Sequence, residues 1–364
     1  MKLREITGEL ERIAPLSLQE DYDNAGLLIG NEHDEINKAL ICLDVTDQVL
    51  EEALQQKCGL IISHHPLIFG GIKRLNGNDP VERLVIKAIQ NRIAIYAIHT
   101  NIDNISGGVN MEIANRLGLK NTEVLKPKKN LLRKLVTFCP AENADQVRQA
   151  MFDAGAGHIG NYDCCSYNID GKGSFRAGEG SDPHVGEINK LHFEKETRIE
   201  IIYPLYLEER IIRSMIAAHP YEEVAYDIYP LENTFNLVGS GIIGDLEEKM
   251  DKMQFLELLK EKFQAGCVKF TGTEKKEVGK IALCGGAGSF LIRAAKARGA
   301  DVFISGDIKY HDFFLSDKSM MIVDIGHYES EQYTKELIFT VLKQKFPTFA
   351  LQISNVNTNP VNYL

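Results

Sequence analysis

The sequence predicts an α/β protein made of two similar βαβ-type halves, with a smaller α+β domain inserted between them. Short apolar runs alternate with amphipathic helical segments over residues 38–119, and the same rhythm returns from residue 280 to the end. Continuous β-branched runs between such helices are typical of a mostly parallel sheet covered on both faces. The two stretches form a weak internal repeat. A segment of different pattern separates them and predicts the inserted domain.

The spacing of apolar residues along the chain predicts where each helix and strand of the two halves begins and ends. Apolar residues at helical spacing predict a first helix that starts near Leu3 and ends near Pro15. The next strands and helices are expected, in order, at 39–45, 46–58, 59–66, 79–92, 93–100 and 107–119. In the second half they are expected at 280–286, 288–299, 300–306, 320–326, 328–346 and 349–356.

The middle segment predicts the β-α-β-β-α-β order of the ferredoxin-like unit. Its elements are expected at 134–140, 144–157, a glycine-rich hairpin around 171–204, then 206–219 and 224–231. We therefore expect a discontinuous domain of residues 1–130 and 234–364, with residues 131–233 inserted as a second domain. The flanking stretches "KPKKN" and "LENTFN" are expected to be polar linkers.

Composition restricts the classes of function. The formal net charge of −10 disfavours general binding to nucleic acids, whose phosphates an acidic surface repels. No apolar run reaches the length of a membrane span, and the charged N-terminal helix does not resemble a signal peptide. The seven cysteines include no CxxC pair, which favours reduced thiols in the cytoplasm.

Histidines and carboxylates gather at the expected strand ends. His64 and His65 are adjacent at one such end, and three further pairs share an i, i+4 spacing, which places both groups on one face of a helical turn. These pairs are His99/Asp103, Asp307/His311 and His327/Glu331. Because the carboxyl ends of parallel strands lie at one edge of a sheet, we expect these groups to converge.

Imidazoles and carboxylates together are the ligands of divalent transition metals such as Zn, Fe, Mn, Co or Ni. More than four convergent donors predict two ions, since a carboxylate can bridge two cations. Any one of these pairs taken alone is more simply a solvated or capping feature. The turn "CGGAGS", from Cys284 to Ser289, has two open interpretations, a phosphate-binding strand-to-helix turn or a tightly packed one.

Several segments together resemble the GTP cyclohydrolase I type 2 homologues, also called Nif-three-like dinuclear-metal proteins. The segments are, in order, "DYDNAGLLIG", "SHHPLIF", "HTNID", "GSGIIGDL", "CGGAGS", "SGDIKYHD" and "GHYESE". The resemblance covers residues 1–126 and 235–364. The stretch "HPYEEVAYDIYPL" resembles the PII/CutA-like domain that longer bacterial members carry.

The resemblance implies a toroidal homohexamer with paired metal ions facing an internal cavity. It places the metal ligands at His64, His65, Asp103, His327 and Glu331, with His99 close by. The family name implies hydrolytic opening of the guanine imidazole ring of GTP.

The leading hypothesis is therefore a cytoplasmic dinuclear-metal hydrolase, in which metal-bound hydroxide attacks a nucleotide or related heterocycle. We expect His311 to transfer a proton and Asp307 to orient its ring, unless His311 only caps a helix or packs beside the metals. One alternative is a phosphoesterase that uses the same ions. The other is a metal-binding hexamer with a regulatory or scaffold role and no turnover.

Overall fold

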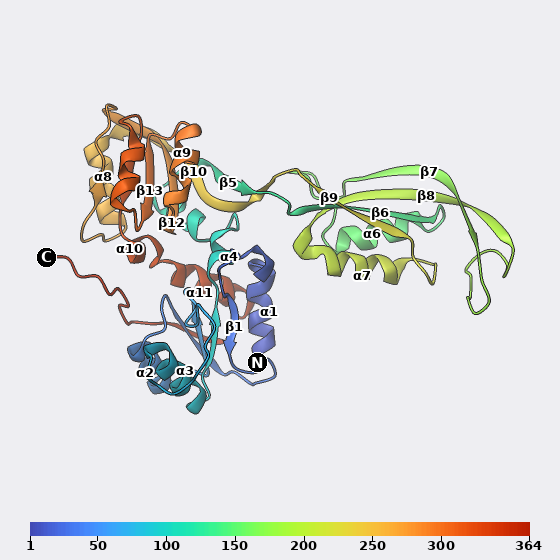
Figure 1. Ribbon diagram of the computed structural model, residues 1–364, viewed down its shortest axis with the longest axis horizontal. Helices are drawn as coiled ribbons and strands as arrows, with labels where there is room; N and C mark the ends of the chain where they lie inside the picture. The colour runs from blue at the N-terminus through green and yellow to red at the C-terminus, as the bar shows by residue number, and fades with distance from the viewer. The chain divides into compact units, whose positions relative to one another are not determined.

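The structure is a computed structural model that describes residues 1–364, and it divides into two compact units. Unit 1 consists of Met1–Pro127 and Asn236–Leu364, and unit 2 consists of Lys128–Phe235. Unit 2 is the mostly green part of the chain in Figure 1. None of the helices combines the length and apolar character that crossing a bilayer requires.

The first sheet of unit 1 has five strands in the order β1-β4-β3-β2-β15. The last four of these are parallel to one another, and β1 pairs antiparallel to β4. The strand bounds are Gly26–Ile29 for β1, Lys38–Cys42 for β2, Leu60–Ser63 for β3, Ala94–Ala97 for β4 and Ala350–Ile353 for β15. The inner strands are buried almost throughout, as expected for a sheet covered on both faces.

Helices cover both faces of this first sheet. Helices α2 (Asp47–Gln55) and α3 (Pro80–Gln90) pack on one face, in a core with Leu40 and Ile61. Helices α1 (Leu3–Ile13) and α11 (Thr334–Lys345) contribute to the core on the other face. Successive residues of each strand point alternately into one core and then the other. Both faces of the strand are therefore buried, which explains the continuous apolar runs in the sequence.

The second sheet of unit 1 has six strands in the order β11-β14-β13-β12-β10-β5, of which β12, β13 and β14 are parallel. The strand bounds are Lys120–Lys128 for β5, Phe235–Asp251 for β10, Lys269–Phe270 for β11, Glu277–Ala287 for β12, Val302–Gly306 for β13 and Met321–Asp324 for β14. Helix α9 (Ile292–Ala297) packs on one face, and α5 (Val109–Arg116) and α8 (Lys252–Lys262) pack on the other.

One hydrophobic core joins the two sheets. It contains Ile62 and Tyr96 of the first sheet together with Leu283 and Ile304 of the second. Unit 1 is therefore a single packed body, although its residues come from both ends of the chain. The remaining short helices are α4 (Thr100–Asp103), α10 (His327–Glu331), η1 (Leu16–Leu18), η3 (Ser289–Leu291) and η4 (Tyr310–Ser316).

The expected polar linkers are in part strand ends, which corrects the sequence interpretation. Lys126 and Lys128 belong to β5, and Phe235 begins β10, its neighbour in the second sheet. The two strands approach closely at Gly239, where an added Cβ would lie 2.2 Å from the Lys126 carbonyl oxygen. Backbone pairing with β10 therefore orders a stretch whose lysines had suggested a solvated linker.

Unit 2 has one antiparallel sheet in the order β7-β8-β6-β9, with two helices on one face. Its elements follow the β-α-β-β-α-β order of ferredoxin-like folds. They are β6 (Leu132–Pro140), α6 (Ala144–Asp153), β7 (Ser166–Arg176), β8 (Leu191–Pro204), η2 (Leu205–Leu207), α7 (Glu208–Ala218) and β9 (Tyr226–Leu231). The core beneath the helices includes Leu135, Ile199, Ile201 and Met215.

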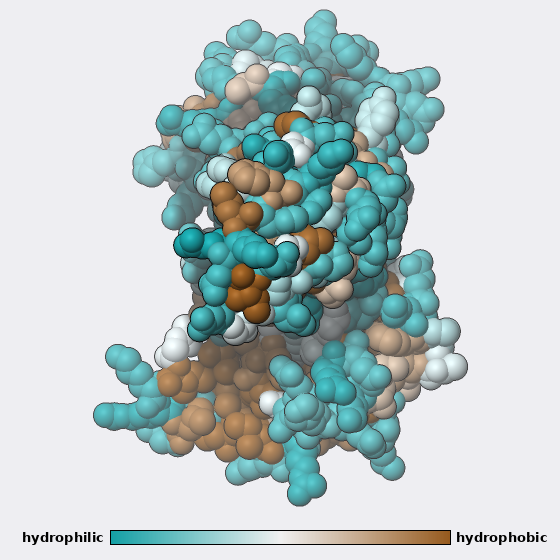
Figure 2. Space-filling view, turned by 90° about the vertical axis from the view of Figure 1, so that its right-hand side faces the viewer, coloured by the Kyte–Doolittle hydropathy of each residue, from teal (hydrophilic) through white to brown (hydrophobic).

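Unit 2 also exposes large apolar side chains. Figure 2, viewed from the right-hand side of Figure 1, shows small brown apolar patches among teal residues on the part nearest the viewer. The exposed large apolar residues of this unit include Ile159, Tyr162, Tyr167, Ile169, Ile188, Leu191, Phe193, Ile216 and Tyr229.

We predict that unit 1 folds without unit 2. The chain leaves unit 1 at the end of β5 and returns at the start of β10, and these strands are neighbours in one sheet. Replacing residues 128–235 by a short Gly/Ser linker should therefore leave a cooperative thermal transition, measured by circular dichroism. A truncated chain without such a transition would contradict the prediction.

Candidate metal centre

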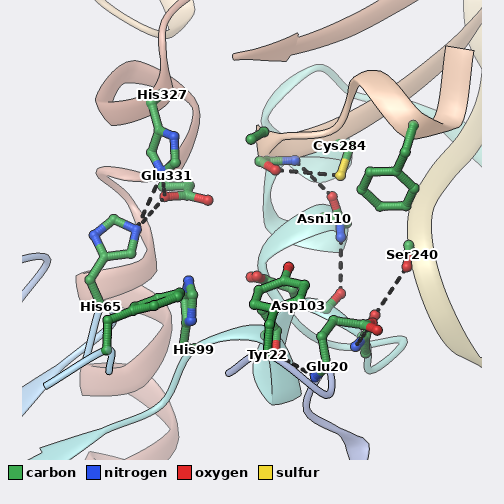
Figure 3. A pocket seen from close by; sticks show the side chains of 16 residues that line it. Glu20, Tyr22, His65, His99, Asp103, Asn110, Ser240, Cys284, His327 and Glu331 are labelled. Atoms are coloured by element: carbon green, nitrogen blue, oxygen red, sulfur yellow. Dashed lines mark hydrogen bonds and ion pairs between the residues drawn. The ribbon is translucent and has the colours of Figure 1, made fainter. Parts of the chain in front are cut away.

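The candidate site lies in unit 1, where strand ends of its two sheets meet. His64 and His65 directly follow β3, and Asp103 ends the short helix α4 that follows β4. His327 and Glu331 are the first and last residues of α10, which follows β14 of the second sheet. Ligands of α/β proteins commonly lie beyond such carboxyl ends of strands. All five residues that the resemblance implies as ligands thus lie together, and Figure 3 shows four of them around one pocket.

Glu331 is the centre of the cluster. Its Oε2 atom lies 3.0 Å from His65 Nε2, 3.0 Å from His327 Nε2 and 3.8 Å from His64 Nε2. His64 Nε2 is also 3.7 Å from Asp103 Oδ1. The potential ligand atoms form three overlapping sets, and within each set all the atoms lie within 4.8 Å of one another. These sets are His64/His65/His99, His65/His327/Glu331 and His64/Asp103/Glu331.

All four imidazoles of the cluster are held by the ring nitrogen that points away from it. In each ring Nδ1 contacts an oxygen, at 2.7 Å or 2.9 Å, so that Nε2 faces the other donors. The four contacts are His64 with Ile98 O, His65 with Asp44 Oδ1, His99 with Asp23 Oδ1 and His327 with Asp307 Oδ2. Carboxylate or carbonyl partners of this kind orient metal-binding histidines and fix their tautomer.

Two buried atoms of the cluster have no hydrogen-bond partner, and both fit a metal ion. They are His64 Nε2 and Asp103 Oδ1. The Ile98 carbonyl can only accept, so His64 carries its proton on Nδ1 and turns the lone pair of Nε2 toward Asp103. Burial lowers the pKa of His64, which keeps its ring neutral. A metal ion between this buried lone pair and the carboxylate oxygen would satisfy both atoms.

The charges of the cluster shift the pKa values of its members in opposite directions. Burial opposes the charged forms, but hydrogen bonds from the surrounding imidazoles hold the pKa of Glu331 well below its usual range. Against the same burial, Asp44 and Glu331 raise the pKa of His65 to about 10, and Glu331 with Asp307 raises that of His327 to about 9. Burial and the Glu331 charge raise the pKa of Asp103.

The structure corrects the expected partnership of Asp307 and His311. Asp307 contacts His327 Nδ1 rather than His311. It precedes η4 with a φ of 50°, so the i, i+4 spacing does not place the two side chains on one helical face. The exposed His311 ring lies against Tyr310 and Phe314 and does not line the pocket beside the cluster.

Sequence reasoning missed the carboxylates of Asp44 and Asp23. It placed His99 only near the expected ligands and not among them. Asp44 follows β2 and Asp23 lies between η1 and β1, and they hold His65 and His99 respectively. The Asp23 side chain is fully buried and also accepts hydrogen bonds from Thr100. The position of Asp44 at the end of the expected strand 39–45 was an available signal. Asp23 lies in an irregular loop with no comparable pattern.

The glycine-rich turn packs against the cluster, which favours the tightly packed interpretation. The backbone N–H groups of Gly285, Gly286 and Gly288 donate to side chains of Asn110, Ser330 and Ser305. They are therefore not free to bind a phosphate. An added Cβ at Gly286 would lie 2.3 Å from Glu331 Oε1, so a glycine there makes room for the central carboxylate.

A cavity of about 420 Å³ opens beside the cluster, and three aromatic side chains line it. Tyr22 and Phe69 are stacked, with ring centroids 6.4 Å apart and planes inclined by 23°. Tyr22, Phe69 and Phe290 are 65%, 52% and 58% exposed, so their rings are accessible to a ligand. Figure 3 shows Tyr22 among the side chains that line the cavity. Burial, followed by the charges of Asp103 and Glu331, raises the pKa of the nearby Cys284 thiol, which therefore stays protonated.

Comparison with known proteins shows the family. The family model described as Duf34/NIF3 (NGG1p interacting factor 3) matches residues 1–360. The chain belongs to the Duf34/NIF3 family. A Bacillus subtilis relative named "GTP cyclohydrolase 1 type 2 homolog" is 38% identical over 363 residues, covering 97% of this chain and 96% of the relative. A Staphylococcus aureus relative of the same name is 34% identical over 369 residues, covering all of both chains.

Solved structures of Duf34/NIF3 relatives share the fold. A Bacillus cereus protein described as related to NIF3 superposes with a TM-score of 0.87 at 38% identity, covering 100% of this chain and 99% of that one. A Staphylococcus aureus protein superposes with a TM-score of 0.78 at 30% identity over the same shares. The architecture described above is therefore that of the Duf34/NIF3 family.

We predict that Asp307 acts on metal binding through His327, whereas His311 does not. Asp307→Asn should weaken metal affinity roughly 10- to 100-fold, because the His327 ring loses its charged partner. His311→Ala, from the same exposed segment, is the matched control and should keep wild-type metal content. Elemental analysis and competition with a chelator measure both. Equal affinity in the two variants would contradict the assignment.

We predict that metal binding at pH 7 releases protons. The pKa values of about 10 and 9 mean that the pair His65 and His327, whose Nε2 atoms lie 3.3 Å apart, holds at least one extra proton at neutral pH in the metal-free protein, and a metal binds only the deprotonated ring. Apparent affinity should therefore rise with pH through about pH 9. Calorimetry of Zn²⁺ binding in buffers of different ionisation enthalpy counts the protons. The same heat in every buffer would refute proton release.

Proposed function

We propose that this Duf34/NIF3 protein is a metal-dependent hydrolase that acts on a nucleotide or related heterocycle. The observation that carries the proposal is the convergence of buried imidazole and carboxylate atoms, two of them without partners, beside a cavity with aromatic walls. The proposed ligands are His64, His65, Asp103, His327 and Glu331.

We propose two divalent transition-metal ions per chain. The donors of the three overlapping sets outnumber the four positions of one tetrahedral shell. Glu331 belongs to two of these sets, which suits a carboxylate shared by two cations. Even without His99, the five proposed ligands exceed the four positions of one tetrahedral shell.

The aromatic rim supports a planar substrate. Exposed rings near a polar centre offer stacking surfaces for a flat heterocycle, and Tyr22, Phe69 and Phe290 provide them. The relatives' name, "GTP cyclohydrolase 1 type 2 homolog", makes a purine nucleotide the first substrate to test.

Each part of the site has a distinct role in the proposed reaction. Divalent ions in such a centre act as Lewis acids and activate water near neutral pH. Asp44 and Asp307 hold the His65 and His327 rings in one orientation, which keeps the ligand set in place before substrate enters. Because His311 does not line the cavity, we assign proton transfer to Nε2 of His99, a lining residue whose Nδ1 is held by Asp23.

We further propose that unit 2 is a PII/CutA-like domain and that the chain assembles as a homohexamer. The resemblance of "HPYEEVAYDIYPL" and the β-α-β-β-α-β order of unit 2 support the first point. The resemblance of unit 1 supports the second.

Turnover of GTP tests the proposed function. Metal-loaded wild-type protein should consume GTP and yield a ring-opened product heavier by one water, detected by mass spectrometry. Glu331→Gln should lose more than about 100-fold of this activity together with metal, because it removes the central ligand. His311→Ala is the matched control and should retain both.

Two outcomes would contradict hydrolysis of the heterocycle. Release of phosphate with an intact purine ring would favour the phosphoesterase alternative. No turnover of any nucleotide by protein that holds both metals would favour a regulatory or scaffold role.

A further inference from the structure

A second cavity lies entirely within unit 2, apart from the metal centre. Its volume is about 530 Å³, which is in the range of sites for small molecules. It lies beside the segment 177–190, which joins β7 to β8, and the segment 219–225, which precedes β9. The stretch "HPYEEVAYDIYPL" contributes Tyr221, Glu222 and Glu223 to its lining, and the proposed function of unit 1 does not use it.

Aromatic rings form part of its wall. The Phe175 and Tyr221 rings are 5.9 Å apart at 60°, and His184 lies 6.3 Å from Tyr221. Phe138 also lines the cavity. The faces of such rings carry partial negative charge and attract cations.

The carboxylate of Glu196 lines the same cavity without a cationic partner. Its Oε1 accepts a hydrogen bond of 2.9 Å from the Tyr221 hydroxyl, and no lysine, arginine or histidine pairs with it. Two other glutamates of β8 are paired, Glu194 with His192 at 2.8 Å and Glu200 with Lys134 at 3.0 Å. Glu196 is thus the glutamate of this strand whose charge is left for a ligand.

Local structure holds the Glu196 carboxylate in place. An added Cβ at Gly173, on the neighbouring strand β7, would lie 2.0 Å from Glu196 Oε2, so only glycine leaves room for it there. Burial, reinforced by Glu196, raises the pKa of Tyr221, so its hydroxyl remains a donor to the carboxylate. The acceptor is therefore preorganised at the cavity wall.

A larger cation suits this cavity better than a metal ion. The three carboxylates that line it, Glu196, Glu222 and Glu223, outnumber its one arginine, Arg176. Every set of donors close enough to share one metal ion lies in unit 1. Dispersed carboxylates with aromatic walls are the surroundings that ammonium groups bind.

We propose that the cavity of unit 2 binds a small organic cation of the ammonium class. The aromatic rings of Phe175 and Tyr221 contact its alkyl groups, and Glu196 neutralises its charge. The site gives the insertion a ligand of its own, independent of the reaction in unit 1.

Choline and its uncharged isostere 3,3-dimethylbutan-1-ol test the proposal, because they share one shape and differ in charge. Isothermal titration of the full-length protein should detect choline binding, with the isostere weaker by about tenfold or more. Glu196→Gln keeps the side-chain shape and should weaken choline binding by a similar factor. Glu194→Gln, on the same strand but paired with His192 outside the cavity, is the matched control and should bind as wild type.

Phe175→Leu provides a second variant, which removes the ring but keeps an apolar side chain. It should also weaken choline binding, with thermal unfolding and metal content unchanged. The proposal is overturned if choline and spermidine both fail to bind, if the isostere binds as well as choline, or if Glu196→Gln binds as well as Glu194→Gln. Because metal content is read from unit 1, these outcomes are distinguishable from a failure of the proposed hydrolase function.

Discussion

The buried carboxylate of Glu331 is the group on which the geometry of the candidate metal centre depends. A charged carboxylate in a protein interior is costly unless partners of opposite polarity surround it. Here the partners come from both sheets of unit 1, His64 and His65 after β3 and His327 on α10. Gly286 must also lack a side chain for the carboxylate to fit. The core shared by the two sheets therefore sets the relative positions of these side chains, and it also contributes to the stability of the unit.

A second layer of carboxylates fixes the orientation of the imidazoles, and the end of the chain takes part in it. Asp44 contacts His65 through one oxygen and accepts a hydrogen bond of 2.5 Å from Thr358 through the other. Further along, Asn359 and Tyr363 donate to the buried carboxylate of Glu329, two residues before Glu331. The C-terminal segment after β15 thus supports the site from outside. A precise ligand set requires such outer contacts, because an unsupported ring is free to rotate.

The two units use carboxylates in different ways. In unit 1 the donors converge so closely that small inorganic cations suit them, and in unit 2 the carboxylates are dispersed among aromatic rings. The helices and sheet of unit 2 enclose a separate core around Leu135, Ile201 and Met215. The chemistry proposed for each site therefore follows from the spacing that its own framework imposes.

The sequence by itself determined the alternation of elements, the strand ends that carry histidine, and the imidazole and carboxylate groups that meet there. These depend on local period and residue chemistry, which need no knowledge of distant contacts, and the helix expected from Leu3 appears as α1. The tertiary structure decided what depends on the packing of remote segments. It paired Asp307 with His327 rather than His311, because the strained backbone at Asp307 turns the chain before η4 begins. It also brought Asp23 to His99 across 76 residues of chain, a contact that no local pattern encodes.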